Sequence, residues 1–198
     1  MRVMQNREFA MTTTDPDPAL RPYPWQYISS WTMRDGTQVT IRPIRPEDEP
    51  VMVKFHGTLS DRTVYMRYFS SLSLARRTAH ERLARICFSD YEREIVLVAE
   101  HKDPQTGAQH ILAVGRLNKL QADGKAEIAV LVSDEYQHKG LGTELLRRLV
   151  QVARDEKVRR LVAEMLRDNL AIHTIFKRLG FRLRLVNDPG SVQAILDL

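Results

Sequence analysis

Two glycines one residue apart follow a basic pair in the segment Tyr136–Thr143, which reads YQHKGLGT. The segment lies between an apolar run, which predicts a strand, and an amphipathic run, which predicts a helix. A glycine turn that opens a helix leaves unpaired N–H groups at the positive end of the helix dipole, where anions bind. Gly140 and Gly142 also let a ligand approach the backbone closely and permit positive φ. On these residues alone, a phosphate-binding loop and a plain strand-to-helix turn are equally good interpretations.

Two well-known phosphate motifs do not match this loop. A P-loop needs Gly-Lys-Ser/Thr at its end, which residues 140–143 do not supply. A dinucleotide fingerprint needs a third glycine within a run of βαβ units, and neither is present. Lys139 would attract an anionic ligand, whereas for Arg147 and Arg148 we favour a solvated helix face.

Glu127 is the carboxylate whose position suits acid–base chemistry. It lies in KAEIAVLVS, where the residues on both faces of the expected strand are otherwise apolar. Such a strand is typically covered on both sides, so partial desolvation of Glu127 would make it a stronger base. From periodicity alone, a satisfied or solvent-reaching glutamate at the start of the strand is an equally good interpretation.

Other reactive residue types give weaker signals. Cys87 is the single cysteine and sits between Ile86 and Phe88, so we expect a buried thiol with neither a disulfide nor a nucleophilic role. The six histidines are scattered without ligand-like spacing, so we expect no metal.

Composition sets the broad class. The chain has 198 residues, 43% hydrophobic and 28% charged, which suits one globular domain. No run approaches the roughly 18 apolar residues of a membrane span, and the first residues lack the apolar core of a secretory signal, so we expect a cytoplasmic protein without a membrane partner. The net charge of +5 permits polyanionic ligands. Dispersed basic residues, without a recognition helix or stacking platform, argue against nucleic acid. The oligomeric state stays open.

The elements around these residues follow from local signals. Residues 1–20 are expected to be a flexible tail and 21–198 a single domain. Asp35-Gly36 predicts a hairpin, and helices are expected at 45–59, from Ser60, over 74–87, at 140–156 and at 168–179. Strands are expected at 94–100, 110–117, 125–133, 159–166, 181–186 and 192–198. Mostly consecutive strands with one strand–helix–strand unit near 126–165 predict a mixed sheet.

Two segments together resemble a known superfamily. Gln137-x-x-Gly140-x-Gly142 resembles the Gln/Arg-x-x-Gly-x-Gly/Ala motif of GNAT acyl-CoA-dependent N-acyltransferases, and the stretch from Asn169 to Phe181 resembles their next element. The resemblance covers about 40–198. It implies an α/β fold of the α+β type: a mixed, mostly antiparallel sheet of about six to seven strands, with helices on both faces and a splayed parallel strand pair at the cofactor site.

Further stretches narrow the resemblance to one bacterial branch. RPYPWQYISSWTMRDGTQVTIRPIRPEDEP, LSDRTVYMRYFSSL and SDYEREIVLVAE resemble the acetyltransferase domain of protein lysine acetyltransferases that modify AMP-forming acyl-CoA synthetases. The chain is too short for the large synthetase-like region that precedes this domain in many such proteins, so we expect a single-domain form. The implied partner is a protein substrate, an AMP-forming acyl-CoA synthetase.

The resemblance also implies a site. Acetyl-CoA would be the cosubstrate, with Glu127 as the general base for direct attack by a lysine amine in a ternary complex. The cofactor would contact the backbone of the preceding strand end, the loop and the next helix start: Leu131, Val132, Ser133, Gln137, His138, Lys139, Gly140, Leu141, Gly142, Thr143 and Asn169. Phe176 stands where many members carry a tyrosine acid, which puts a dedicated proton donor in doubt. Of the substitutes, we favour a packing or surface role for His173, and Tyr136 has no support.

Two other functions stay open at this stage. The first is acetylation of a small amine such as a polyamine. Such a site should have an acidic wall, but besides Glu127 only the pair Asp134-Glu135 offers one. The second is a non-catalytic acyl-CoA sensor, which the phenylalanine at position 176 would permit.

Overall fold

The computed structural model describes residues 22–120, 124–186, 188 and 190–198. The expected tail over 1–20 lies outside these residues. The helices and strands, in chain order, are β1 Ser29–Thr32, β2 Gln38–Pro43, α1 Glu49–Gly57, α2 Asp61–Tyr68, α3 Leu74–Arg77, α4 His80–Cys87, β3 Glu94–Lys102, β4 Gln109–Lys119, β5 Lys125–Val132, α5 Leu141–Asp155, β6 Arg160–Leu166, α6 Leu170–Arg178, β7 Arg182–Leu185 and β8 Ser191–Asp197.

The strands within the described residues form one sheet of eight, in the order β1-β2-β3-β4-β5-β6-β8-β7. Only β5 and β6 pair in parallel, and every other neighbouring pair is antiparallel. The mixed, mostly antiparallel sheet is therefore confirmed. The expected number of six to seven strands is too low, because both arms of the Asp35-Gly36 hairpin and both carboxy-terminal runs join the sheet.

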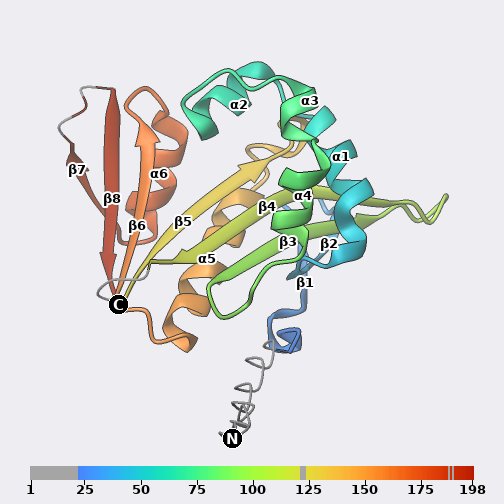
Figure 1. The fold of residues 1–198 in the computed structure, drawn as a ribbon, viewed down its shortest axis with the longest axis horizontal. Helices are drawn as coiled ribbons and strands as arrows, with labels where there is room; N and C mark the ends of the chain where they lie inside the picture. Colours follow the sequence, from blue (N-terminus) through green and yellow to red (C-terminus); the bar gives the residue numbers. More distant parts are fainter. Residues whose placement is uncertain (1–21, 121–123, 187, 189) are drawn as a thin grey trace, which may run out of the picture.

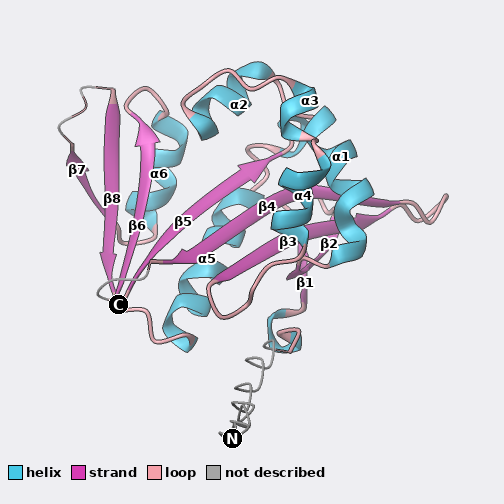
Figure 2. Ribbon diagram, viewed as in Figure 1, coloured by secondary structure: helices cyan, strands magenta, loops and turns pink. Residues whose placement is uncertain are grey.

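Helices cover the two faces of the sheet separately (Figure 1; Figure 2). On one face, α1, α2 and α4 enclose a core with Phe55, Leu83 and Leu131. On the other, α5 packs on β4 and β5 through apolar residues such as Leu145 and Leu149. The apolar stripe of α5 recurs every three to four residues, as in a helix with one buried face.

Helix ends follow the expected local signals, with one exception. The Ser60 side chain accepts from the N–H of Thr63 and caps α2, and Gly180 ends α6 with φ of 88°. The single helix expected over 74–87 is wrong, because the chain breaks into α3 and α4. The N–H of Thr78 closes α3, and Ala79 has an extended ψ of 132°. Arg77, buried at the end of α3, donates to the carbonyl of His56, which holds this turn against α1.

A buried ion pair fixes the start of α1 to the sheet. Arg42 of β2 donates to both carboxylate oxygens of Asp48, at 2.8 and 2.7 Å, and also to Glu100 of β3. Asp48 further accepts from the N–H of Arg45 at 2.7 Å. With every partner satisfied, the pair sets one arrangement of strand and helix; removal of one partner would leave a buried charge uncompensated.

We therefore predict that Asp48→Ala lowers the free energy of unfolding by about 3–5 kcal/mol, because Arg42 loses its main buried partner. Asp197→Ala is the matched control. Asp197 likewise forms ion pairs with arginine, in its case with two of them, but its side chain is 45% exposed, against 8% for Asp48. Urea unfolding at pH 7 measures both. A loss for Asp48→Ala no larger than that of the control would contradict the assignment.

His56 is a second buried polar group on this face. His56 is only 2% exposed, and its Nδ1 has no hydrogen-bond partner within the described part of the chain. Burial lowers the pKa of His56 to about 4, and the guanidinium groups of Arg77 and Arg82 act in the same direction. The imidazole is thus neutral in the folded protein at pH 7.

This pKa predicts an acid-sensitive stability. Between pH 6.5, the ordinary value, and about 4, the unfolded chain binds a proton at His56 that the folded chain refuses. Stability that is complete above pH 6.5 should therefore fall by about 3 kcal/mol on acidification across that window. His56→Phe should remove this part of the pH dependence, measured by urea unfolding at pH 7, 5.5 and 4. The exposed His110→Phe is the control, and equal pH slopes in both variants would refute the prediction.

Candidate functional site: an open strand edge beside a glycine loop

The parallel strands β5 and β6 separate after a short contact. Their pairing runs from Lys125 opposite Arg160 to Glu127 opposite Val162 and then stops. The N–H of Ser133 donates to the carbonyl of Leu112, on the β4 side. Because backbone groups alternate between the two edges of a strand, those of Leu131 also face β4, whereas those of Val130 and Val132 face the gap toward β6.

This alternation refines the expected contacts at the strand end. Of Leu131, Val132 and Ser133, only Val132 turns its backbone groups to the gap, and Val130, which the sequence reasoning missed, does the same. The missed signal was available, since a strand that presents residue 132 at one edge presents residue 130 there too. The carbonyl of Val132 accepts from the Gln137 side chain at 3.2 Å, so its N–H is the group left for a ligand.

The glycine loop lies beside this edge and has free donors. Within the described residues, none of the backbone N–H groups from His138 to Thr143 has an acceptor. Gly140 precedes α5 with φ of 92°, which disfavours any side chain there. A Cβ at Gly142 would lie 3.3 Å from Cγ2 of Val132, so the loop and the strand end are in close contact. Unpaired donors at the positive end of a helix are where anions bind, and α5 has 15 residues, so this loop is a candidate anion site.

Two side chains of the loop are engaged within the protein. Lys139 forms an ion pair with Asp35 of the β1–β2 turn at 3.0 Å, and its ammonium lies over the Tyr136 ring. The Gln137 amide nitrogen donates to Thr63 at 3.1 Å, which ties the loop to α2. The donors of the candidate anion site are therefore backbone groups rather than the lysine. Trp31 of β1 lies against Gly140.

Across the gap, Asn169 caps the start of α6. Its Oδ1 accepts from the N–H of Ile172 at 3.4 Å, as a helix cap, and its amide nitrogen has no acceptor in the described chain. His173 donates from Nε2 to the carbonyl of Leu166 at 3.0 Å, which is a structural use of that ring. Phe176 is buried, edge-on against Phe181 at 4.8 Å, and has no proton to give.

Glu127 is the last residue of β5 that pairs with β6, and the gap begins after it. Its side chain is exposed, so the expectation that it is covered on both sides is wrong. The apolar neighbours Ala126 and Ile128 do bury their side chains, but they point to the opposite face of β5. Glu127 shares that face with Ala129 and Leu131, and Leu131 packs in the core beneath α1 and α4.

A small cavity lies on the same face of β5, and its lining begins two residues beyond Glu127, at Ala129. It has a volume of about 60 Å³ and is enclosed by α1, α2, α4 and the strands β3 to β5. Its lining includes Ala129 and Leu131 together with polar side chains from four elements: His56, Arg67, Tyr68, Arg82 and Arg116. This basic lining comes from residues far apart in the sequence, so no local sequence pattern could predict it.

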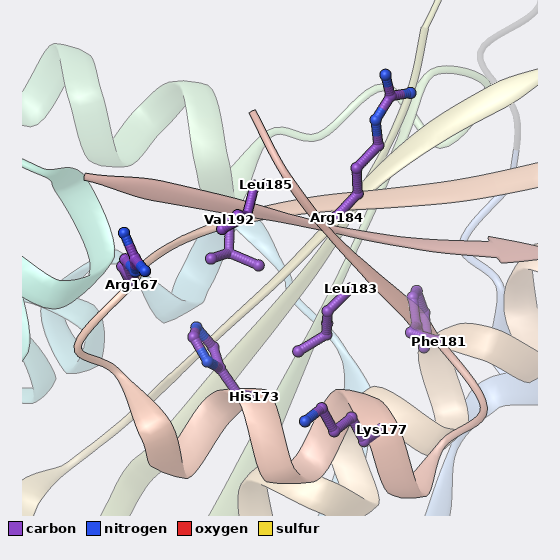
Figure 3. Close-up of a pocket in the computed structure, with 8 residues that line it drawn as sticks. All are labelled: Arg167, His173, Lys177, Phe181, Leu183, Arg184, Leu185 and Val192. Atoms are coloured by element: carbon purple, nitrogen blue, oxygen red, sulfur yellow. The ribbon is translucent and has the colours of Figure 1, made fainter. Parts of the chain in front are cut away.

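A larger, open groove of about 480 Å³ lies between α6 and the strands β7 and β8. Figure 3 shows His173 and Lys177 of α6 directed toward Leu183 and Val192, while Arg184 extends away from the helix. The cations at its rim diverge, so they do not converge on one point as a ligand site requires.

Other candidates have explained positions. Burial raises the pKa of the Cys87 thiol to about 12, which suits an inert thiol. Arg147 and Arg148 both pair with Glu144 on α5. Across the described ranges, no group of three or more His, Cys, Asp or Glu residues could hold a metal ion. No described helix combines the length and apolar character needed to cross a membrane.

Comparisons with known proteins give this site a family. The family described as "Acetyltransferase (GNAT) domain" matches residues 38–182. The chain is 30% identical over 151 residues to "Acetyltransferase PA5475" of Pseudomonas aeruginosa, which covers 76% of this chain and 78% of that protein. It is 27% identical over 158 residues to "Acetyltransferase Pat" of Mycolicibacterium smegmatis, covering 75% of this chain but 42% of that longer protein.

Solved structures agree. The crystal structure of the GNAT domain of S. lividans PAT superposes with a TM-score of 0.78 at 28% identity, over 89% of this chain and all of that one. The family expected from the loop and the segment from Asn169 is thereby confirmed, as is the fold with its parallel strand pair. The chain belongs to the GNAT family of acetyltransferase domains.

Proposed function

We propose that this chain transfers an acetyl group from acetyl-CoA to the ε-amino group of a lysine in a protein, and that the acceptor is an AMP-forming acyl-CoA synthetase. The observation that carries the proposal is the pairing of an unfilled strand edge with a row of unpaired N–H groups. The acceptor assignment rests on the sequence resemblance and on the likeness to the PAT domain.

The residues of the site fit coenzyme A. Its pyrophosphate needs several donors without a side chain in the way, and the N–H groups of 138–143 offer this around Gly140 and Gly142. Its pantetheine arm carries amides that can pair like an added strand with Val130 and Val132. The Asn169 amide nitrogen would donate to the arm from the other side of the gap. Gln137 and Lys139 would hold the loop in shape.

Bound acetyl-CoA supplies an activated acetyl thioester, and the chain must supply a neutral amine. A lysine has a pKa near 10.4, so its deprotonation at pH 7 costs about 4–5 kcal/mol. Glu127 is a carboxylate at the mouth of the gap and open to solvent. It can accept the ammonium proton directly or through a water, which is general-base catalysis.

Attack is proposed to be direct, within a ternary complex. A covalent acyl-enzyme needs a nucleophile, and the thiol of Cys87 is buried with its pKa raised. Phe176 cannot protonate the departing sulfur, so we expect that proton to come from water. A small polyamine acceptor is disfavoured, because the cavity that begins two residues beyond Glu127 is lined with arginines.

Glu127→Gln tests the base. The variant should bind acetyl-CoA with nearly unchanged affinity and lower turnover by about 10²–10⁴-fold, because the amide cannot accept the proton. Initial rates with a lysine-containing acceptor measure this. Glu164→Gln, which changes an exposed carboxylate in β6, is the control and should turn over normally. Normal turnover of Glu127→Gln at neutral pH would remove it from the mechanism.

Gly142→Glu tests the loop. It places bulk against Val132 and negative charge beside the proposed phosphate site, so affinity for acetyl-CoA should fall by about tenfold or more. Gly57→Glu adds the same charge at a position with open space around it. Calorimetric titration compares the two, and unchanged affinity in Gly142→Glu would exclude the loop as the phosphate site.

The overall proposal is tested by intact-protein mass spectrometry. The chain is mixed with acetyl-CoA and an AMP-forming acetyl-CoA synthetase, beside a sample that contains Glu127→Gln. We expect the synthetase to gain the mass of one acetyl group with the wild type and none with the variant. No gain despite bound acetyl-CoA would favour a small amine acceptor or a non-catalytic sensor instead.

A further inference from the structure

The cavity beside Glu127 contains more positive charge than its surroundings neutralise. Arg116 forms a two-bonded ion pair with Glu94. Among the described residues, no carboxylate lies within ion-pair distance of Arg67 or Arg82, although both line the cavity. Two guanidinium groups are therefore present without a counterion, in a space partly shielded from water.

Two hydrogen-bonding atoms of the cavity lining are also unsatisfied. Nε of Arg82 and Nδ1 of His56 are buried and have no partner in the described part of the chain. A buried polar atom without a partner is energetically costly, so proteins retain few of them without a reason. An oxygen-bearing anion would satisfy the Arg82 donor and, with the imidazole tautomer protonated at Nδ1, the histidine as well.

The two free arginines are held in place by an aromatic ring. The guanidinium carbons of Arg67 and Arg82 lie 5.2 and 5.0 Å from the centre of the Tyr68 ring. Stacking on an aromatic face leaves the N–H edges of a guanidinium available and limits its motion. The pair is therefore preorganised to receive a planar anion such as a carboxylate.

The cavity lies where the group next to a reacting amine would fall. Ala129 of its lining is two residues beyond Glu127 on the same face of β5. Arg116 interacts electrostatically with Glu127 as well as with Arg67, which places the base and the arginine cluster within one local field. The volume of about 60 Å³ fits a carboxylate and a few waters, and is too small for a sugar or a nucleobase.

We propose that this cavity binds a carboxylate of the acceptor, so that the acetylated lysine lies close to an aspartate or glutamate side chain in the acceptor protein. Arg67 and Arg82 are the specificity-determining residues, and His56 completes the pocket. The proposal rests on the proposed function, because it places the acceptor amine at Glu127. It also gives a physical reason for rejection of polycationic amines, whose second charge would meet the arginines.

The test measures kcat/KM for acetylation of short peptides with one central lysine. At each of the three positions on either side, one peptide carries Glu and its partner carries Gln. The wild type should prefer Glu over Gln by about tenfold at one position or more, as expected for a charge-assisted hydrogen bond. Equal kcat/KM within every pair would overturn the proposal.

Variants assign the preference to the cavity. Arg82→Gln and Arg67→Gln should each bring the Glu/Gln ratio close to 1, while Arg82→Lys, which keeps the charge, should retain part of it. Arg62→Gln, an exposed arginine of α2 outside the cavity, should leave the ratio at the wild-type value. Thermal unfolding checks that each variant is folded. A ratio that survives in both Arg82→Gln and Arg67→Gln would contradict the assignment.

Two further experiments ask whether the cavity binds a carboxylate at all, and whether that carboxylate belongs to the acceptor or to the acyl group. In the first, sodium acetate is titrated into the full chain with isotopically labelled arginine, and sodium chloride keeps the ionic strength constant. Acetate should shift the Arg82 Nε–H resonance saturably. A shift no larger than that caused by chloride alone would overturn the proposal, and this result needs no measurement of turnover. If acetate binds but no peptide is acetylated, the proposed function fails while the anion site stands. Arg82-dependent preference for succinyl-CoA over acetyl-CoA would assign the carboxylate to the acyl group and overturn the acceptor assignment.

Discussion

The early end of the β5–β6 ladder is the constraint on which the site depends. Parallel pairing covers Lys125 to Glu127 and then stops, although both strands continue. An interior sheet edge with free backbone groups is costly unless something fills it. Here the gap exposes Val130 and Val132 and brings the carboxyl end of β5 to the glycine loop. Glu127 is the last residue of β5 that pairs with β6, and its side chain is exposed.

The two faces of the sheet then take different tasks. On the α5 side, the start of the helix has unpaired N–H groups, and the β1–β2 turn holds Lys139 through Asp35. On the opposite side, α1, α2 and α4 bury the arginine-lined cavity next to Glu127. The Arg42–Asp48 pair anchors the first of these helices. Under the proposed function, the cofactor would approach from the α5 side and the acceptor from the opposite side, and the two would meet at the gap.

Local chemistry allowed much of this to be predicted from the sequence. Turn and cap residues such as Gly36, Ser60, Asn169 and Gly180 act within a few positions of themselves, so the elements that they delimit were found. The partial desolvation expected for Glu127 is wrong, because the exposure of a strand side chain depends on which distant elements pack over it, and local sequence does not show these. The break at Thr78 was missed because it is enforced by contact of Arg77 with α1. The cavity could not be predicted from the sequence, because Arg67, Arg82 and Arg116 come together only in the folded chain.

A titration of coenzyme A into the isotopically labelled chain, followed through the backbone amide resonances, tests the central claim most directly. If the open edge and the glycine loop form the cofactor site, the largest and saturable shifts fall on residues 138–143, Val130 and Val132. Shifts that instead concentrate on Arg167, Lys177 and Arg184 around the groove of Figure 3, with the loop unmoved, would contradict the account.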